Sequence, residues 1–182
     1  MKDVSVHVAH LMAAAARTAP KGGGKDFLEI TVIDNDEDLK RIADKMAEYA
    51  PDSTNEAYWR RDADNIANCQ ALLLVGLAKS NLAGYDCGAC GYASCKEFEK
   101  NRQMNDRPMG YGGPHCVMRM IDIGCALSSA AKTASLLNVD NRVQQRVGAA
   151  ARALGLIEAD VVMGIPVGVY GKSIFHDRQA KK

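Results

Sequence analysis

Apolar positions along the chain form two kinds of pattern, amphipathic stretches at helical spacing and short continuous runs rich in β-branched residues. The first kind indicates helices and the second indicates buried strands. Helices are expected over residues 4–19, from the capping residues 34–38 to residue 49, and over 56–68, 94–104, 116–137 and 138–154. Strands are expected over 27–33, 71–78 and 160–169. This mixed order of helices and strands predicts an α+β fold.

Three of these segments carry further expectations. Nearly every position of 116–137 is apolar or small, which predicts a central helix buried on most sides. Gly164 and Pro166 are expected to break the last strand. The final residues, 171–182, are polar, and we expect a partner or ligand to be needed to order them.

Length and charge narrow the class of protein. With 182 residues and 47% hydrophobic content, the chain is long enough for one domain, 1–182, into which residues 84–116 are inserted. Lys and Arg total 23 against 22 Asp and Glu, a net charge of +1. Such a balance has no basic excess with which to hold a polyanion, so we expect no nucleic-acid partner.

The sequence also gives an expectation about the compartment. The first residues lack the basic flank and apolar core of a signal peptide, and no window is apolar for the length of a membrane span. We therefore expect a cytoplasmic protein with no membrane partner. Because the cytoplasm is reducing, the six cysteines are expected to be ligands or redox groups instead of disulfides.

Four of the six cysteines have a spacing that suggests a metal centre. Cys87, Cys90 and Cys95 lie close together, and Cys116 follows after twenty residues. Four thiolates repel one another unless a cation holds them together. A [4Fe–4S] cluster takes four thiolates, and three from a short loop with a fourth from a remote segment suit its size. The four cysteines are therefore the predicted ligands of such a cluster.

Two features of the sequence bear on which metal binds: glycines follow two of the cysteines, and there is only one short Cys-x-x-Cys pair. Gly88 and Gly91 directly follow two of the cysteines, where a residue without Cβ lets the backbone turn its N–H groups toward sulfur. Structural zinc also takes four thiolates but usually uses two short Cys pairs. Zinc and a Cys87/Cys90 redox dithiol remain alternatives, whereas Cys69 and Cys125 are expected to be small core residues.

Two resemblances extend these expectations. The segment Asp86–Cys95 with Cys116 resembles the four-cysteine [4Fe–4S] module of electron-transfer proteins such as the corrinoid iron–sulfur protein. Over nearly its full length the chain is similar to prokaryotic ferredoxin-domain-containing proteins. The second similarity is carried by Ala15–Lys21, Arg61–Asn65, the cysteines, Asp140–Val143, Gly164–Pro166, Gly171–Lys172 and Asp177–Arg178. It implies an iron–sulfur electron-transfer protein with a redox partner protein.

A third resemblance concerns the fold. Ala19–Pro20, the glycines 22–24 and the following strand resemble the flavin loop of the nitroreductases, and the Gly164–Pro166 strand end fits as well. This implies a central sheet sandwiched by helices, a homodimer, and FMN as an alternative cofactor at the dimer interface. The residues implied to bind it are Gly22, Gly23, Gly24, Lys172 and Arg178. The Arg-containing segment that grips the FMN phosphate in that family has no counterpart after Met1.

Other polar residues are given structural or secondary roles. Asp122 in the apolar helix is expected to pair with Arg119, three residues earlier on the same side. Arg61 with Asp62, and Asp140 with its neighbours, are expected to form caps and ion pairs. His115, next to Cys116, either tunes the metal centre or is simply a loop residue.

Three hypotheses for function remain open. The first is electron transfer by a [4Fe–4S] cluster. The second is an FMN-dependent oxidoreductase of nitroreductase type that uses the cluster as a relay. The third is a non-catalytic module whose inserted loop is held by zinc.

Overall fold

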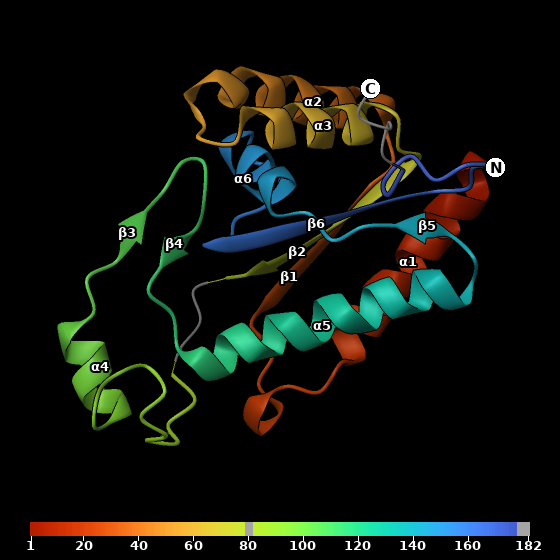
Figure 1. Cartoon of the computed structure of the whole chain (residues 1–182). Coiled ribbons are helices and arrows are strands. Elements are labelled where there is room, and N and C mark those ends of the chain that lie inside the picture. The colour runs from red at the N-terminus through yellow and green to blue at the C-terminus, as the bar shows by residue number, and fades with distance from the viewer. Residues whose placement is uncertain (79–81, 178–182) are drawn as a thin grey trace.

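A computed structural model of the chain describes residues 1–78 and 82–177 (Figure 1). Its main sheet has four antiparallel strands in the order β1-β2-β6-β5. These strands are β1 (Leu28–Ile33), β2 (Ala71–Leu77), β6 (Val161–Gly168) and the short edge strand β5 (Asp140–Asn141). The predicted strands therefore form the centre of the molecule.

Helices cover both faces of this sheet, as the resemblance implied. α1 (Lys2–Thr18) and α5 (Val117–Leu136) lie on one face, and α2 (Asp36–Tyr49), α3 (Glu56–Ala67) and α6 (Gln145–Ala153) lie on the other (Figure 1). Side chains of β2 alternate between the two cores, with Leu72 and Leu74 on the α2/α3/α6 side and Leu73 and Val75 on the α1/α5 side. A strand buried on both faces has no polar positions, which explains the continuous apolar run.

Close packing of α6 on the sheet depends on a glycine. A Cβ built at Gly148 would lie 1.9 Å from the backbone oxygen of Val162 in β6. No other residue type fits at that distance, so Gly148 lets the helix backbone approach the strand directly.

The cysteine-containing segment connects β2 to α5. Residues 82–94 are irregular, and they lead into the short helix α4 (Cys95–Asn101). A two-stranded ribbon, β3 (Asn105–Asp106) with β4 (Gly112–Gly113), returns the chain to Cys116, which is the N-cap of α5. Figure 1 shows α4 and this ribbon beyond the end of the main sheet. Two 3₁₀ turns, η1 (Gly22–Gly24) and η2 (Ala50–Asp52), follow α1 and α2.

Several details differ from the sequence-based expectations. The helix at 94–104 ends at Asn101, and the ribbon occupies the stretch expected to be a loop. Asp140 does not cap a helix. It lies in β5, where it pairs with Gly168 of β6, and α6 begins only at Gln145. The terminal segment is ordered by the chain itself as far as it is described, since Phe175 is fully buried in the α2/α3/α6 core.

The prediction that α5 is buried on most sides is wrong. Met120, Ile121 and Leu136 are exposed to solvent. The reason is that α5 packs on α1 and the sheet, and within the described residues no element covers its outer face.

The expected break in the last strand is also absent, since β6 pairs with β2 without interruption from Val161 to Val167. Gly164 exchanges both backbone hydrogen bonds with Gln144, and alternate residues of a strand face the same neighbour. Pro166 therefore faces the gap between Gln144 and β5, where its missing N–H breaks no ladder hydrogen bond.

Candidate metal centre

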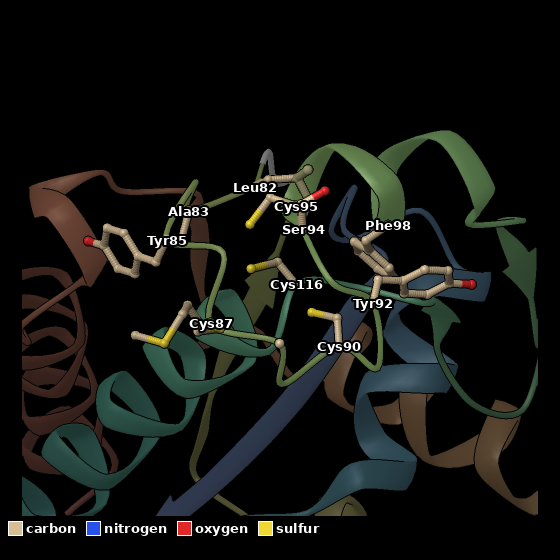
Figure 2. A pocket seen from close by; sticks show the side chains of 12 residues that line it. Leu82, Ala83, Tyr85, Cys87, Cys90, Tyr92, Ser94, Cys95, Phe98 and Cys116 are labelled. Atoms are coloured by element: carbon tan, nitrogen blue, oxygen red, sulfur yellow. The ribbon is translucent and has the colours of Figure 1, made fainter.

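All four predicted ligands line one pocket, although they come from different parts of the chain. The pocket is partly open to solvent. Figure 2 shows the side chains of Cys90, Cys95 and Cys116 pointing toward a common space, with Cys87 on the neighbouring loop. Cys116 is buried, Cys90 and Cys95 are half-buried, and Cys87 is exposed. The fold therefore brings the four cysteines to one pocket, with three of the thiols toward a common space.

Left-handed backbone positions shape the loop that carries the first three cysteines. Gly88 has φ 72° and Gly91 has φ 83°, both in the region that favours glycine, and Asp86 has φ 46°. The Asp86 carboxylate accepts a hydrogen bond of 2.6 Å from the backbone N–H of Cys95. This bond joins the start of the loop to its end, so the three cysteines stay on one short, closed turn.

A capping arrangement fixes the third cysteine at the start of α4. The Ser94 hydroxyl accepts a 3.1 Å hydrogen bond from the Glu97 N–H, and the Glu97 carboxylate accepts one of 3.1 Å from the Ala93 N–H. Ser-x-x-Glu is a sequence signal of a helix N-terminus. That signal locates the start of α4 from sequence, whereas nothing in the sequence reveals the bond from Cys95 to Asp86.

Backbone N–H groups point at two of the sulfurs. Val117 N–H lies 3.3 Å from Cys90 Sγ. Burial by itself would raise the pKa of the Cys116 thiol, but hydrogen bonds from backbone N–H groups and a contact with Cys90 outweigh it, so this pKa lies below its usual value. The N–H groups belong to Ala83, Met118 and Arg119. This end of the pocket therefore favours thiolate, the form that binds metal.

The four thiols are not arranged around one point as they would be around a bound zinc ion. A tetrahedral zinc site with bonds of about 2.3 Å brings its sulfurs within about 3.8 Å of one another. In residues 1–78 and 82–177, no group of three His, Cys, Asp or Glu side chains is arranged to hold one metal ion. The four cysteines line one pocket, as both a zinc site and an iron–sulfur cluster would need.

Apolar and aromatic groups form the rest of the pocket wall. Leu82, Ala83 and Met118 line it together with Phe98, which is buried and in contact with the Tyr92 ring at 5.5 Å between centroids. An apolar shell limits water access and so influences the reduction potential of a centre held there.

The loop of glycines 22–24 lies close to the cysteine pocket, but its polar groups are bonded to other parts of the protein. The Gly22 N–H donates to Asp122 at 2.7 Å, and Arg119 donates to the Gly22 carbonyl at 2.9 Å. Lys21 donates to carbonyl oxygens at the end of α1, including that of Arg17 at 2.6 Å. The groups closest to the loop therefore already have partners, one of them a carboxylate.

The other predicted flavin residues lie elsewhere in the chain. Lys172 is exposed and pairs with Asp177 at 3.3 Å, and this segment contacts Asn141 through His176. Asn141 follows the C-terminal end of α5, whereas Gly22 contacts its second turn, and a helix of 20 residues spans about 30 Å. One copy of the chain therefore does not bring Lys172 to the glycines, and Arg178 lies outside the described residues.

Arg119 connects the glycine loop with the cysteine pocket. Its backbone N–H points at the Cys116 sulfur, and its guanidinium, which is 1% exposed, pairs with Asp122 at 2.9 Å and stacks on the Phe27 ring. The predicted pairing of Arg119 with Asp122 is confirmed. Its link to Gly22, which is 97 residues away in sequence, has no signal in the sequence.

Comparison with known proteins identifies the family. A family model described as "Uncharacterized protein containing a ferredoxin domain (DUF2148)" matches residues 112–178, and a model for a proposed Fe–S cluster segment matches 82–101. A protein of Archaeoglobus fulgidus, described as uncharacterised, is 43% identical over 182 residues, which are 100% of this chain and 96% of that protein. The chain belongs to this ferredoxin-domain family.

Solved structures similar to this ferredoxin-domain protein share its fold. A nitroreductase with bound FMN from Desulfitobacterium hafniense aligns with a TM-score of 0.60 at 14% identity, covering 93% of this chain and 80% of that one. A BluB-like flavoprotein from Clostridium difficile aligns with a TM-score of 0.58 at 17% identity, covering 98% and 85%. The nitroreductase-like architecture predicted from sequence is thereby confirmed.

The remaining histidines and cysteines of the ferredoxin-domain protein lie away from the pocket lining. His115 turns toward the β3–β4 ribbon, where its ring nitrogen contacts the Gly112 carbonyl at 3.1 Å and Asp160 at 3.6 Å. Burial, opposed by the Asp160 charge, lowers the pKa of His115. Cys69 is buried as predicted, and burial raises its pKa to about 12, whereas Cys125 is half-buried on α5. In the described residues no helix has the length and hydropathy to cross a bilayer.

Proposed function

We propose that Cys87, Cys90, Cys95 and Cys116 bind one [4Fe–4S] cluster, and that the protein passes single electrons to a redox partner protein. The observation that carries this proposal is that all four cysteines line one pocket, with the thiols of Cys90, Cys95 and Cys116 toward a common space (Figure 2). The match of residues 82–101 to an Fe–S segment supports the same assignment.

The protein's own residues have clear tasks in this function. When bound, the cluster supplies a one-electron redox centre. The N–H groups that point at Cys90 and Cys116 favour negative charge on the sulfurs. Hydrogen bonds to sulfur and exclusion of water are among the factors that set the potential of such a centre. Cys87 is exposed, so electrons would enter or leave on its side of the pocket.

An anaerobic redox titration tests electron transfer. Protein reconstituted with iron and sulfide under argon should bleach reversibly with one electron per chain, at a potential between about −700 and +450 mV. A metal-loaded protein that takes up no electron in this range would contradict the proposed role. It would favour a structural metal that only holds the inserted loop in place. Zinc content measured on the same sample separates these outcomes.

A second candidate function is an FMN-dependent oxidoreductase in which the metal centre relays electrons. The fold shared with an FMN-bound nitroreductase and the closeness of the Gly22–Gly24 turn to the cysteine pocket favour it. In one copy of the chain, however, Lys21 and the Gly22 N–H do not fit a phosphate, because both already bind protein acceptors. FMN binding would therefore need Lys172 and Arg178 from a second copy. Yellow colour that persists after iron removal would support this candidate.

We also propose that residues 84–116 form an insertion in a single domain, that the chain is a homodimer, and that it works in the cytoplasm. The exposed apolar side chains of α5 support the homodimer, because a second copy of the chain could cover them. The six free thiols support the cytoplasm, because that compartment is reducing. Light scattering of the metal-loaded protein at two concentrations tests the dimer, and a monomeric mass at both would contradict it.

A further inference from the structure

A second polar site lies on the opposite side of the sheet from α5 and its cysteine end. Arg61 and Tyr58 of α3, Arg146 of α6, and Arg142 in the link between β5 and α6 line one surface hollow. α6 packs on β6, and α3 packs on α6 (Figure 1). Two of the sequence motifs that carry the family resemblance, Arg61–Asn65 and Asp140–Val143, meet here, and the proposed function uses neither.

A buried carboxylate fixes two of the arginines. Asp62 is 1% exposed, and its Oδ1 accepts hydrogen bonds from Nε and Nη2 of Arg61. Its other oxygen accepts a 2.9 Å bond from Arg146. The same two guanidinium groups stack on the half-exposed Tyr58 ring, at 5.0 and 5.3 Å from its centroid. Held by a carboxylate and an aromatic ring together, these side chains are preorganised and lose little freedom on binding a ligand.

Arginine is concentrated in this hollow, although the net charge of the protein is only +1. Three guanidinium groups line it, and Arg61 and Arg146 share the carboxylate of Asp62. Arg142 also donates to the Phe175 carbonyl at 2.7 Å, which anchors it to the C-terminal segment. A guanidinium carries five N–H donors, so Arg61 and Arg146 each keep donors beyond those bonded to Asp62.

We propose that this hollow binds the phosphate group of a small molecule through Arg61, Arg142 and Arg146. A phosphate monoester carries close to two negative charges at neutral pH and offers three acceptor oxygens, which suit three guanidinium groups. A carboxylate carries one charge and offers two oxygens, fewer than three guanidinium groups can bind. Arginine forks also match the oxygen geometry of phosphate. Asp62 is a positioning residue in this site, since it orients two arginines.

Titration calorimetry of the full, metal-loaded chain with inorganic phosphate, at constant ionic strength, tests the proposal. Binding should be saturable with one site per chain. Arg142→Gln should raise Kd roughly tenfold or more, the loss expected for one charge-assisted hydrogen bond. Arg60→Gln is the matched control, because Arg60 lies beside Arg61 but pairs with Glu56 on the exposed face. It should leave Kd within about twofold.

Two further arms complete the test. The Kd of a phosphate monoester such as glycerol phosphate is compared with that of inorganic phosphate. Tighter binding of the monoester would show that the natural ligand carries its phosphate on an organic molecule. Broadening of the phosphorus resonance of phosphate by the parent chain gives a readout that needs no variant. Absence of saturable binding, equal binding by Arg142→Gln and the parent, or the same response to chloride would each overturn the proposal.

Discussion

Cys116 shows at the scale of one residue how the fold prepares a ligand. Its thiol is buried, which would oppose ionisation, yet it lies at the N-terminus of α5 among backbone N–H groups that lower its pKa. Cys125, two turns further along the same helix, is flanked by the closed hydrogen bonds of the helix interior. The two cysteines therefore differ in the chemistry that their surroundings allow.

Replacing each of these two cysteines tests that difference. Cys116→Ser should lose most of the iron and sulfide after anaerobic reconstitution, because serine offers no thiolate at the pocket. Cys125→Ser should retain the parent content, since this residue does not line the pocket. Iron and sulfide are measured per chain for both variants and the parent. Equal loss in the two variants would mean that the effect is one of folding and not of ligation.

Asp26 predicts a pH dependence of stability close to the glycine turn. Burial alone would raise the pKa of its carboxyl, but the Arg17 hydrogen bond at 2.6 Å, the Leu28 N–H and nearby positive charges outweigh it, so this pKa lies below 3.8. A carboxyl with a lowered folded-state pKa stabilises the protein above pH 3.8 and loses this effect as the pH falls through the folded-state value.

Asp26→Asn should therefore lower the free energy of unfolding of the metal-free protein by about 0.5–1 kcal/mol at neutral pH. The difference should shrink toward zero as the pH falls through the folded-state pKa of Asp26, because the parent carboxyl then becomes protonated and loses its charge. Urea unfolding of parent and variant at several pH values measures it. A difference that is constant across the pH range would contradict the ion-pair explanation.

At the scale of elements, the loop that holds three cysteines depends on glycine conformation. Gly91 has φ 83° and no atom within 4 Å of a built Cβ, so a substitution there meets backbone strain but no steric clash. Gly124 of α5 also has open space around a built Cβ, but its backbone is helical. The pair separates conformational strain from the simple addition of a methyl group.

Gly91→Ala should strain the loop by about 1 kcal/mol and speed the loss of iron to a chelator several-fold. Gly124→Ala should leave that rate unchanged and raise the melting temperature slightly, because alanine favours helix by up to about 1 kcal/mol. Iron release and thermal unfolding are followed for both. Identical release from the two variants would show that the loop conformation does not control retention.

The sequence predicts those parts of the molecule that have a clear hydrophobic periodicity or a clear spacing of cysteines. β2 and α2 follow from a continuous apolar run and an amphipathic repeat, and the cysteine spacing indicates which cysteines line one pocket. The β5 strand was missed because two residues have no periodicity, and its pairing with Gly168 is decided by the rest of the sheet. The Asp62 cluster of arginines was expected to be a set of caps and ion pairs, since nothing in sequence places Arg146 next to Arg61.

At the scale of the whole molecule, one sheet separates two cores, and the contact between α6 and β6 decides how closely the second core packs. Gly148→Ala would place a methyl group on the Val162 carbonyl oxygen, so α6 must move away from the sheet. Overpacking of this kind costs about 1–3 kcal/mol or more. The variant should melt several degrees lower than the parent in calorimetry, whereas an unchanged melting temperature would mean that the helix is free to shift.

The layers also place the two sites apart. The cysteine pocket lies at the N-terminal end of α5, and the arginine hollow lies over α3 and α6 on the other face of the sheet. Because they share no residue, loss of metal and loss of phosphate binding should be separable in variants of each site.

The content of iron, sulfide and zinc in protein purified and reconstituted under argon tests the central claim most directly. About four iron and four sulfide per chain, lost together in Cys116→Ser, is the result expected for a [4Fe–4S] cluster held by the four cysteines. One zinc per chain with no sulfide would contradict it.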